Sequence, residues 1–310
     1  MKRFAFLFPG QGSQSVTMMA GFADNKVIRD TFVEASDVLG TDFWAMVTEP
    51  NDEINQTTNT QPIMLIAGIA TWRAWQATSG LKPAVLAGHS LGEYSALVAS
   101  GALSFIDALP LVRYRAEVMQ NAVPSGVGAM AAILGLDDET VRAVCIEASQ
   151  HEVLEAVNLN SPGQVVIAGN KAAVERGMAL AKEKGAKRAL PLPVSVPSHC
   201  ALMKPAAEQL ADYLKNIQVN TPQIPVLHNA DVTAYSDAEK IKDALVRQLY
   251  SPVRWVETIQ AMHKMSIQQS AECGPGKVLA GLTKRIVAEL PCSALLTVAA
   301  LQEFEDSLKA

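Results

Sequence analysis

The chain has 310 residues, of which 49% are hydrophobic and 18% are charged. This composition is typical of a globular protein rather than a disordered one, and the length is sufficient for two domains with a large core. The formal net charge of −5 leaves no basic excess to neutralise phosphates, so general nucleic-acid binding is not expected. A local basic patch is still compatible with this sum and can attract an acidic partner.

The first apolar run, Phe4–Phe8, is too short for the core of a signal peptide. No stretch of about 18 apolar residues follows, so the sequence predicts no transmembrane helix. The four cysteines lie far apart, without the spacing of a metal site or a redox motif: Cys145, Cys200, Cys273 and Cys292. We therefore expect a cytoplasmic protein with reduced thiols, no metal site and no membrane partner.

Strand and helix patterns alternate over the first hundred residues. Phe4–Phe8 ends at Pro-Gly, which is typical of a short buried parallel strand. Residues 62–75 carry apolar side chains at helical spacing, and 84–87 form another short apolar run. Residues 91–99 return to the helical pattern. A strand, a tight turn and a helix make the elementary α/β unit, so the sequence predicts an α/β fold.

The middle of the chain has a different order of elements. We predict a strand at 129–136, a helix at 137–148, strands at 154–159 and 164–168 joined by a turn at 160–163, a helix at 171–184 and a strand at 186–192. This βαββαβ order is the ferredoxin-like split motif. We therefore predict a small subdomain at 124–196, inserted into a large, discontinuous α/β domain formed by 1–123 and 197–310. A cleft between two such domains is a common place for a functional site.

The pentapeptide Gly-His-Ser-Leu-Gly at 88–92 matches the G-x-S-x-G pattern of a nucleophile elbow. An apolar strand precedes it and a helix follows it, as this turn requires. Small residues on both sides of the serine let the sharp turn close, which exposes the Ser90 hydroxyl at a helix N-terminus. The backbone amide of Leu91 can donate to an oxyanion there. The pattern therefore predicts Ser90 as a nucleophile.

A serine nucleophile needs a base, and the sequence offers five histidines: His89, His151, His199, His228 and His263. His89 adjoins the nucleophile and its side chain leaves the turn in another direction. His151 and His263 are predicted in a polar loop and on a surface helix. His199 lies where the chain leaves the inserted subdomain, at the edge of the predicted cleft. This position favours His199, and His228, after the strand-like segment 225–227, is its rival.

An α/β-hydrolase usually has an acidic residue between the serine and the histidine in chain order. The aspartates between Ser90 and His199 are Asp107, Asp137 and Asp138, and all three have the pattern of helix N-caps. No triad acid is therefore apparent. Either a backbone carbonyl or an amide orients the histidine, or the protein is not a standard α/β-hydrolase.

Four segments carry a family resemblance: Phe-Pro-Gly-Gln-Gly-Ser-Gln at 8–14, Gly-His-Ser-Leu-Gly-Glu-Tyr at 88–94, Asn-Ser-Pro-Gly-Gln at 160–164 and Val-Pro-Ser-His at 196–199. On these segments the chain resembles the malonyl-CoA:acyl-carrier-protein transacylases of bacterial type II fatty acid synthesis. The resemblance implies an α/β-hydrolase-like core with an inserted ferredoxin-like subdomain. It also implies transfer of a malonyl group from malonyl-CoA to the phosphopantetheine thiol of an acyl carrier protein, without a cofactor.

The resemblance implies roles for six positions. Ser90 would carry the malonyl ester, and His199 would be the base. The backbone amides of Gln11 and Leu91 would form the oxyanion hole. The backbone carbonyl of Gln248 would orient His199, in the place of a triad acid.

Arg115 would pair with the malonyl carboxylate. By itself, its position beside Arg113 on a predicted helix is typical of a solvated surface residue. In related polyketide acyltransferase domains, the residues just before the histidine help to select malonyl over methylmalonyl. Ser198 is compatible with both.

Two other functions compete with this one. A serine esterase or thioesterase would use the same elbow, and it would differ in Arg115 and in the access of water to the ester. A non-catalytic protein that binds acyl carriers is the second alternative, which the intact pair Ser90 and His199 disfavours.

An acidic carrier protein needs local basic charge on this acidic chain. Two adjacent pairs are the candidates for a carrier-binding patch: Lys187, Arg188, Lys284 and Arg285. Ordinary solvated charges would give the same pattern.

Overall fold

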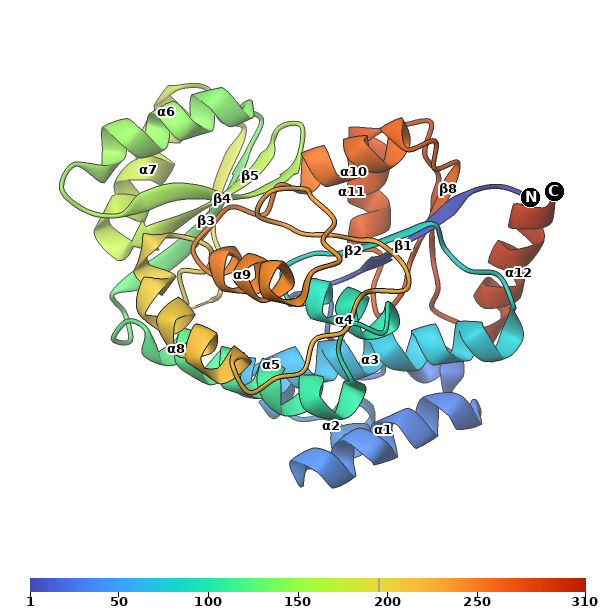
Figure 1. Ribbon diagram of the computed structural model, residues 1–310. Helices are drawn as coiled ribbons and strands as arrows, with labels where there is room; N and C mark the ends of the chain where they lie inside the picture. The colour runs from blue at the N-terminus through green and yellow to red at the C-terminus, as the bar shows by residue number, and fades with distance from the viewer. Residues whose placement is uncertain (195) are drawn as a thin grey trace.

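The computed structural model describes residues 1–194 and 196–310 as a mixed α/β protein built on two sheets (Figure 1). The larger sheet is wholly parallel, with the order β7-β2-β1-β8-β9. Its strands are β1 (Phe4–Phe8), β2 (Val85–Gly88), β7 (Val226–Leu227), β8 (Gln269–Glu272) and β9 (Cys292–Ala294). Parallel strands of this kind are normally covered by helices on both faces.

Ten α-helices belong to this larger part of the described chain. They are α1 (Lys26–Leu39), α2 (Phe43–Thr48), α3 (Thr57–Thr78), α4 (Gly92–Ala99), α5 (Phe105–Asn121), α8 (Lys204–Leu214), α9 (Ala238–Gln248), α10 (Trp255–Lys264), α11 (Val278–Ile286) and α12 (Val298–Lys309). Short 3₁₀ turns lie at Ala20–Phe22, Glu53–Asn55 and Ala201–Met203. None of these helices is long and apolar enough to cross a membrane.

Strand β1 is the central strand and is buried along its whole length, at the residues predicted for it. Because successive side chains of a strand point to opposite faces, Phe4, Phe6 and Phe8 enter one hydrophobic cluster. Ala5 and Leu7 enter a second cluster on the other face. The first cluster includes α3 and α5, and the second includes α10 and α11. This burial on both faces explains the uninterrupted apolar run in the sequence.

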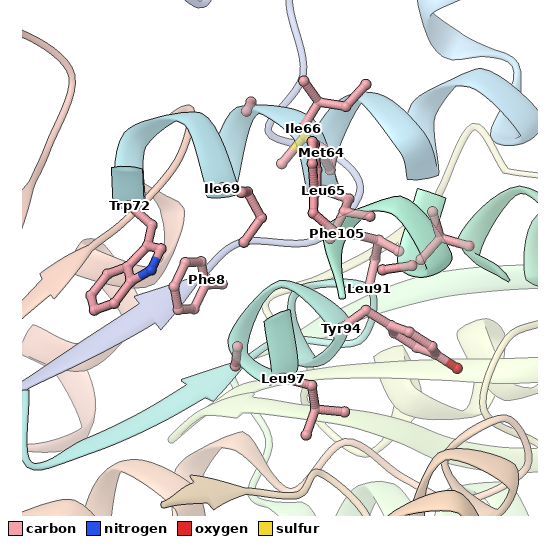
Figure 2. Packing of buried hydrophobic residues seen from close by; sticks show 14 of the residues in the cluster. Phe8, Met64, Leu65, Ile66, Ile69, Trp72, Leu91, Tyr94, Leu97 and Phe105 are labelled. Carbon is pink, nitrogen blue, oxygen red and sulfur yellow. The ribbon is translucent and has the colours of Figure 1, made fainter. Parts of the chain in front are cut away.

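Helix α3 packs closely against both β1 and α4, the helix at which the turn at 88–92 ends. Figure 2 shows Phe8 facing Ile69 and Trp72 of α3, with Tyr94 and Leu97 on α4 nearby. A Cβ on Gly68 would lie 3.4 Å from the Phe8 ring, which is ordinary contact distance, so α3 lies directly against this side chain. The helix is longer than the 62–75 segment predicted from its apolar spacing, since it begins at Thr57 and ends at Thr78.

The chain ends in a helix that closes the aromatic part of the core. Phe304 of α12 packs its ring 5.8 Å from that of Phe4 and 5.6 Å from that of Trp75. The amide of Lys2 donates to the carbonyl of Leu308 at 2.9 Å, so the two termini lie side by side (Figure 1). The C-terminal segment therefore belongs to the folded core.

The second sheet forms a smaller unit with its own helices (Figure 1). Its antiparallel strands have the order β4-β5-β3-β6. The unit consists of β3 (Gly128–Leu134), α6 (Asp138–Ser149), β4 (Leu154–Ser161), β5 (Gln164–Asn170), α7 (Lys171–Glu183) and β6 (Arg188–Pro191). The predicted turn at 160–163 was too long, because β4 continues through Ser161 and leaves only Pro162 and Gly163 between the strands.

Candidate active site

The elbow after β2 depends on three glycines that let backbone segments touch. A Cβ on Gly88 would lie 1.9 Å from the carbonyl group of Gly92, and a Cβ on Gly92 would lie 2.0 Å from the Phe8 carbonyl oxygen. A Cβ on Gly10 would lie 2.5 Å from the carbonyl oxygen of His89. Larger residues at these positions would push the turn away from β1. The glycines therefore serve close packing as well as chain reversal.

Ser90 and His199 form the centre of the candidate site. The Ser90 hydroxyl lies 2.8 Å from Nε2 of His199. Both residues have left-handed backbone, with φ values of 51° for Ser90 and 67° for His199. This conformation is costly for residues with a side chain and persists only where neighbouring structure enforces it. The amide of His199 is held by the carbonyl of Leu249 at 3.0 Å.

The other nitrogen of His199 faces a backbone carbonyl. Nδ1 lies 2.7 Å from the carbonyl oxygen of Gln248, the last residue of α9. Because a carbonyl can only accept, Nδ1 carries the proton and Nε2 is free to accept one from Ser90. A carbonyl therefore occupies the place where a triad acid would stand.

The aspartates considered for that place lie elsewhere. Asp137 is the N-cap of α6, as predicted, and Asp138 lies in the first turn. Asp107 is not an N-cap: Ser104 caps α5, and Asp107 lies in its first turn, exposed to solvent.

Burial strongly favours the neutral form of His199. Its pKa is lowered to about 3, chiefly because the buried ring loses hydration and also because Arg115 repels a second positive charge. The hydrogen bond to Gln248 acts in the opposite direction. His199 can therefore act as a proton acceptor over the whole neutral range.

The remaining histidines do not contact the Ser90 hydroxyl. His228, the rival base, is buried with Nδ1 2.7 Å from Oε1 of Glu93. His89 lies with Nε2 2.8 Å from Oδ1 of Asn160, and burial lowers its pKa. His151 and His263 are exposed, in a loop and on α10.

Arg115 is fully buried on α5, with 0% of its surface exposed. One terminal nitrogen donates to Oε1 of Gln61 at 2.7 Å, and the other to Oε1 of Gln248 at 2.9 Å and to the Ser90 hydroxyl at 3.3 Å. Its Nε has no partner in the described part of the chain. The sequence context of Arg115 is typical of a surface residue, but the fold buries its side chain.

The partners of the Arg115 guanidinium are all neutral. Within residues 1–194 and 196–310, no carboxylate lies within ion-pair distance of it. Desolvation lowers the pKa of this arginine, although Tyr94 and Glu93 oppose the effect. A buried cation without an adjacent anion favours the binding of one. The site is therefore suited to a negatively charged acyl group on Ser90.

Backbone amides lie beside the Ser90 hydroxyl at the start of α4. The amide of Ser90 already donates to Oδ1 of Asn229 at 2.8 Å. The amide of Leu91 has no acceptor among the described residues. The Cβ position of Gly10 lies 3.7 Å from the Leu91 nitrogen, which brings the chain before Gln11 over the elbow. An oxyanion formed at Ser90 would meet the Leu91 amide at a helix N-terminus.

Within the described part of the chain, neither a reactive thiol nor a metal site competes with Ser90. Cys200 follows His199 directly, but its thiol is buried and its pKa is raised to about 12 by desolvation. Across the described ranges, no group of three or more His, Cys, Asp or Glu side chains is arranged to hold a metal ion.

A hydroxyl, a neutral histidine and a buried guanidinium together suit transfer of an acidic acyl group. Comparison with protein families agrees, because the model of the acyl transferase domain matches residues 5–293. The chain belongs to the acyl transferase family.

Two similar proteins from different bacteria are described by the same name. This acyl transferase is 58% identical over 311 residues to the malonyl CoA-acyl carrier protein transacylase of Haemophilus influenzae, which covers 99% of this chain and 100% of that protein. It is 55% identical to the protein of the same description from Escherichia coli, over 95% of this chain and 96% of that protein.

Solved structures resemble this acyl transferase over nearly its whole length. An acyl-carrier-protein S-malonyltransferase from Burkholderia pseudomallei has a TM-score of 0.97 at 58% identity, and covers 99% of this chain and 100% of that one. A malonyl-transacylase in complex with a type II PKS acyl-carrier protein has a TM-score of 0.97 at 52% identity, over 98% and 99% of the two chains.

Four polar residues of this acyl transferase site were not predicted as site residues from the sequence: Gln61, Glu93, Asn160 and Asn229. One signal was available for Asn229, which follows β7 and so lies at the carboxyl end of a parallel strand, where sites gather. Gln61 carried no such signal, because it lies inside the apolar helix α3.

Proposed function

We propose that this protein transfers malonyl groups from malonyl-CoA to the phosphopantetheine thiol of an acyl carrier protein, through a malonyl ester on Ser90. The observation that carries the proposal is the fully buried Arg115, whose guanidinium lies 3.3 Å from the Ser90 hydroxyl without an anionic partner among the described residues. Malonyl differs from acetyl by a free carboxylate, and that group would supply the missing negative charge. The descriptions of the similar proteins support the same substrate pair.

The first half of the reaction would load the enzyme. Nε2 of His199 takes the Ser90 proton as the oxygen attacks the thioester carbonyl of malonyl-CoA. The oxyanion accepts hydrogen bonds from the amides of Gln11 and Leu91. The tetrahedral intermediate then expels the thiolate of coenzyme A, which takes the proton from His199. Malonyl-Ser90 and free coenzyme A remain.

The second half would run the same steps with the carrier thiol. His199 accepts the thiol proton, and the thiolate sulfur attacks the carbonyl of malonyl-Ser90. Collapse expels the Ser90 oxygen, which regains its proton from His199. Only protein groups and the two substrates take part, so we propose that no cofactor is needed.

The topology supports a finer fold assignment. We propose that residues 124–196 form a ferredoxin-like subdomain inserted into an α/β-hydrolase-like core of residues 1–123 and 197–310. The sheet order β4-β5-β3-β6 supports the first part, because it interleaves two βαβ halves. A separate hydrophobic cluster inside the small unit supports the boundary. The elbow at the carboxyl end of a central parallel strand supports the hydrolase-like core.

A hydrolase with the same elbow is the alternative, and it is not favoured. Hydrolysis needs water at the acyl ester, whereas the hydroxyl of Ser90 lies among the buried side chains of His199 and Arg115. The similar proteins are described as transacylases.

The test is to follow the acyl group through both steps. Incubation with malonyl-CoA is expected to add one malonyl group to the intact protein, on the peptide that contains Ser90. Addition of acyl carrier protein with its phosphopantetheine arm is expected to remove that group and to increase the mass of the carrier by the same amount. Release of free malonate at the same rate without a carrier would contradict the proposal and favour the hydrolase.

We further propose that Lys187, Arg188, Lys284 and Arg285 form the carrier-binding patch. All four side chains are exposed. Arg285 donates to Oε1 of Gln164 at 2.7 Å, and Leu134 is the register partner of both Gln164 and Arg188. The backbone of Gln164, which Arg285 contacts, therefore lies about two strand spacings, roughly 10 Å, from that of Arg188.

Gln164, which Arg285 contacts, lies near the candidate site along the chain. Gln164 follows Asn160 by one short turn, and Asn160 contacts His89 beside the nucleophile. A carrier held at the patch would therefore present its flexible arm close to Ser90.

Reversing all four charges to Glu is expected to raise the KM for the carrier protein and to leave acylation by malonyl-CoA unchanged. The physical reason is that an acidic carrier is attracted over the distance of a Debye length, about 10 Å at 0.1 M salt, so added salt should weaken the wild-type carrier step in the same way. Reversal of the exposed residues Lys182, on α7, and Lys184, the C-cap of that helix, serves as the control. An unchanged KM for the carrier in the four-residue variant would reject the patch.

A further inference from the structure

Glu93 is a buried carboxylate three residues after the nucleophile. It lies in the first turn of α4, with 0% of its surface exposed. Oε1 lies 2.7 Å from Nδ1 of His228. Oε2 accepts from the backbone amide of Asn229 at 2.8 Å and from Nε2 of Gln248 at 3.1 Å. The carboxylate thus joins the elbow to two segments that are distant in sequence.

The first of these segments clamps the elbow. Oδ1 of Asn229 accepts from the amide of Ser90 at 2.8 Å, and its Nδ2 donates to the carbonyl of Gly88 at 2.7 Å. The Asn229 side chain therefore holds the turn by two hydrogen bonds, one to the Ser90 amide and one to the Gly88 carbonyl, around the left-handed backbone of Ser90. The backbone of Asn229 is itself fixed by the hydrogen bond to Glu93. Strained backbone persists only where such contacts over-determine it.

The second segment connects Glu93 to the guanidinium of Arg115. The side-chain Nε2 of Gln248 donates to Glu93 and to the Ser90 carbonyl at 2.9 Å, whereas its Oε1 accepts from Arg115 at 2.9 Å. A carboxylate accepts hydrogen bonds and cannot donate them, so it dictates which end of the Gln248 amide faces it. The amide oxygen is thereby directed towards Arg115. A neutral amide at position 93 would weaken this control, because it offers both a donor and an acceptor and leaves the Ser90 carbonyl as the remaining fixed acceptor for Nε2.

We propose that Glu93 is a positioning residue that sets the geometry of the nucleophile through Asn229 and of Arg115 through Gln248. The part that concerns Arg115 rests on the proposed malonyl transfer. The part that concerns Ser90 does not, because it predicts the reactivity of the serine towards any acylating or phosphonylating reagent.

The test compares Glu93→Gln with Glu272→Gln, a matched control. Glu272 is also fully buried, at the end of β8, and accepts from the amide of Ala280 at 2.9 Å in a different part of the core. Thermal unfolding of both variants measures the general effect of neutralising a buried carboxylate. A small uncharged fluorophosphonate then measures the reactivity of Ser90, and the rates of acylation by malonyl-CoA and acetyl-CoA measure the contribution of Arg115.

In Glu93→Gln, fluorophosphonate labelling is expected to slow by about 10², the usual effect of misplacing a reacting group by about 1 Å. The ratio of malonyl to acetyl acylation is expected to fall about tenfold, since a hydrogen bond to a charged group is weakened. Glu272→Gln should change neither quantity. A folded Glu93→Gln variant that keeps both the wild-type labelling rate and the wild-type ratio would overturn the proposal.

Asn229→Ala separates the two connections and provides a second variant if Glu93→Gln does not fold. It removes both side-chain hydrogen bonds to the elbow and a long one, 3.4 Å, from Nε2 of Gln248, and it leaves the shorter 3.1 Å contact of Gln248 with Glu93. Labelling is expected to slow by about 10², while the malonyl to acetyl ratio is retained. Wild-type labelling in this variant would overturn the role assigned to Asn229 and the proposal with it. Failure of the wild-type protein to accept malonyl would reject the proposed function alone, because the fluorophosphonate measurement stands without it.

Discussion

Replacing His199 by alanine is expected to slow acylation by malonyl-CoA by about 10² to 10⁴, the usual contribution of a positioned general base. The reason is the 2.8 Å contact between Nε2 and the Ser90 hydroxyl, which leaves no other proton acceptor at that distance among the described histidines. Stopped-flow measurement of malonyl ester formation checks the rate. Ser90→Ala, which has no hydroxyl to acylate, gives the background.

The exposed His263 supplies the control, since His263→Ala should leave the rate unchanged. The pH profile of the wild-type protein gives an independent check. Because the pKa of His199 is lowered to about 3, the neutral base is already fully populated above roughly pH 5, and acylation should be flat from there to pH 8. A free histidine would lose its base form below about pH 6.5. An acid limb centred near that value, or full activity of His199→Ala, would contradict this role for His199.

Replacing Arg115 by alanine is expected to depress malonyl transfer by about 10² to 10⁴. Removing one partner of a buried charge pair typically costs about 3 to 5 kcal/mol, which corresponds to that loss if it is felt at the transition state. Acetyl transfer should hold or improve, because acetyl has no carboxylate to pair. The rate of malonyl transfer by Arg115→Lys should lie between those of the wild-type protein and of Arg115→Ala, since an ammonium cannot offer two parallel donors to a carboxylate.

The measurement is kcat/KM for malonyl-CoA and acetyl-CoA with each variant. Arg113 is the matched control, because it lies on the same helix and its guanidinium binds the carbonyl of Leu39 at 3.0 Å, away from Ser90. Arg113→Ala should lower kcat/KM for both substrates by the same factor or leave both values unchanged. Equal losses for the two substrates in Arg115→Ala would mean that Arg115 is structural, and malonyl selectivity would need another origin.

The elements that the sequence predicted well are those defined by neighbouring residues. The apolar run Phe4–Phe8 is a buried strand, and the pentapeptide at 88–92 lies between β2 and α4. Strand periodicity, helix capping and turn residues act within about ten positions, so a short stretch of sequence contains their physical causes. The βαββαβ order of the small unit was predictable for the same reason, with errors only at its turns.

The family resemblance implied roles for residues that could not be inferred from the spacing of residues along the chain. The contact between His199 and the Gln248 carbonyl joins residues 49 positions apart, and a backbone carbonyl has no distinctive letter in the sequence. Between Ser90 and His199, pattern reasoning found only aspartates near helix starts and therefore left the orienting group open.

Tertiary structure alone decided the surroundings of the charged groups. Arg115 has a helical context that is typical of the surface, yet α3 and the end of α9 enclose it and bring Gln61 and Gln248 to its guanidinium. Glu93 meets His228 across 135 positions of the chain. Burial and charge pairing of this kind depend on which distant segments pack together, and the pKa of His199 depends on them in turn. The sequence by itself therefore determined the local elements, including the turn that carries Ser90, whereas the tertiary structure decided which charges are buried beside that serine, because desolvation is a property of the packed chain.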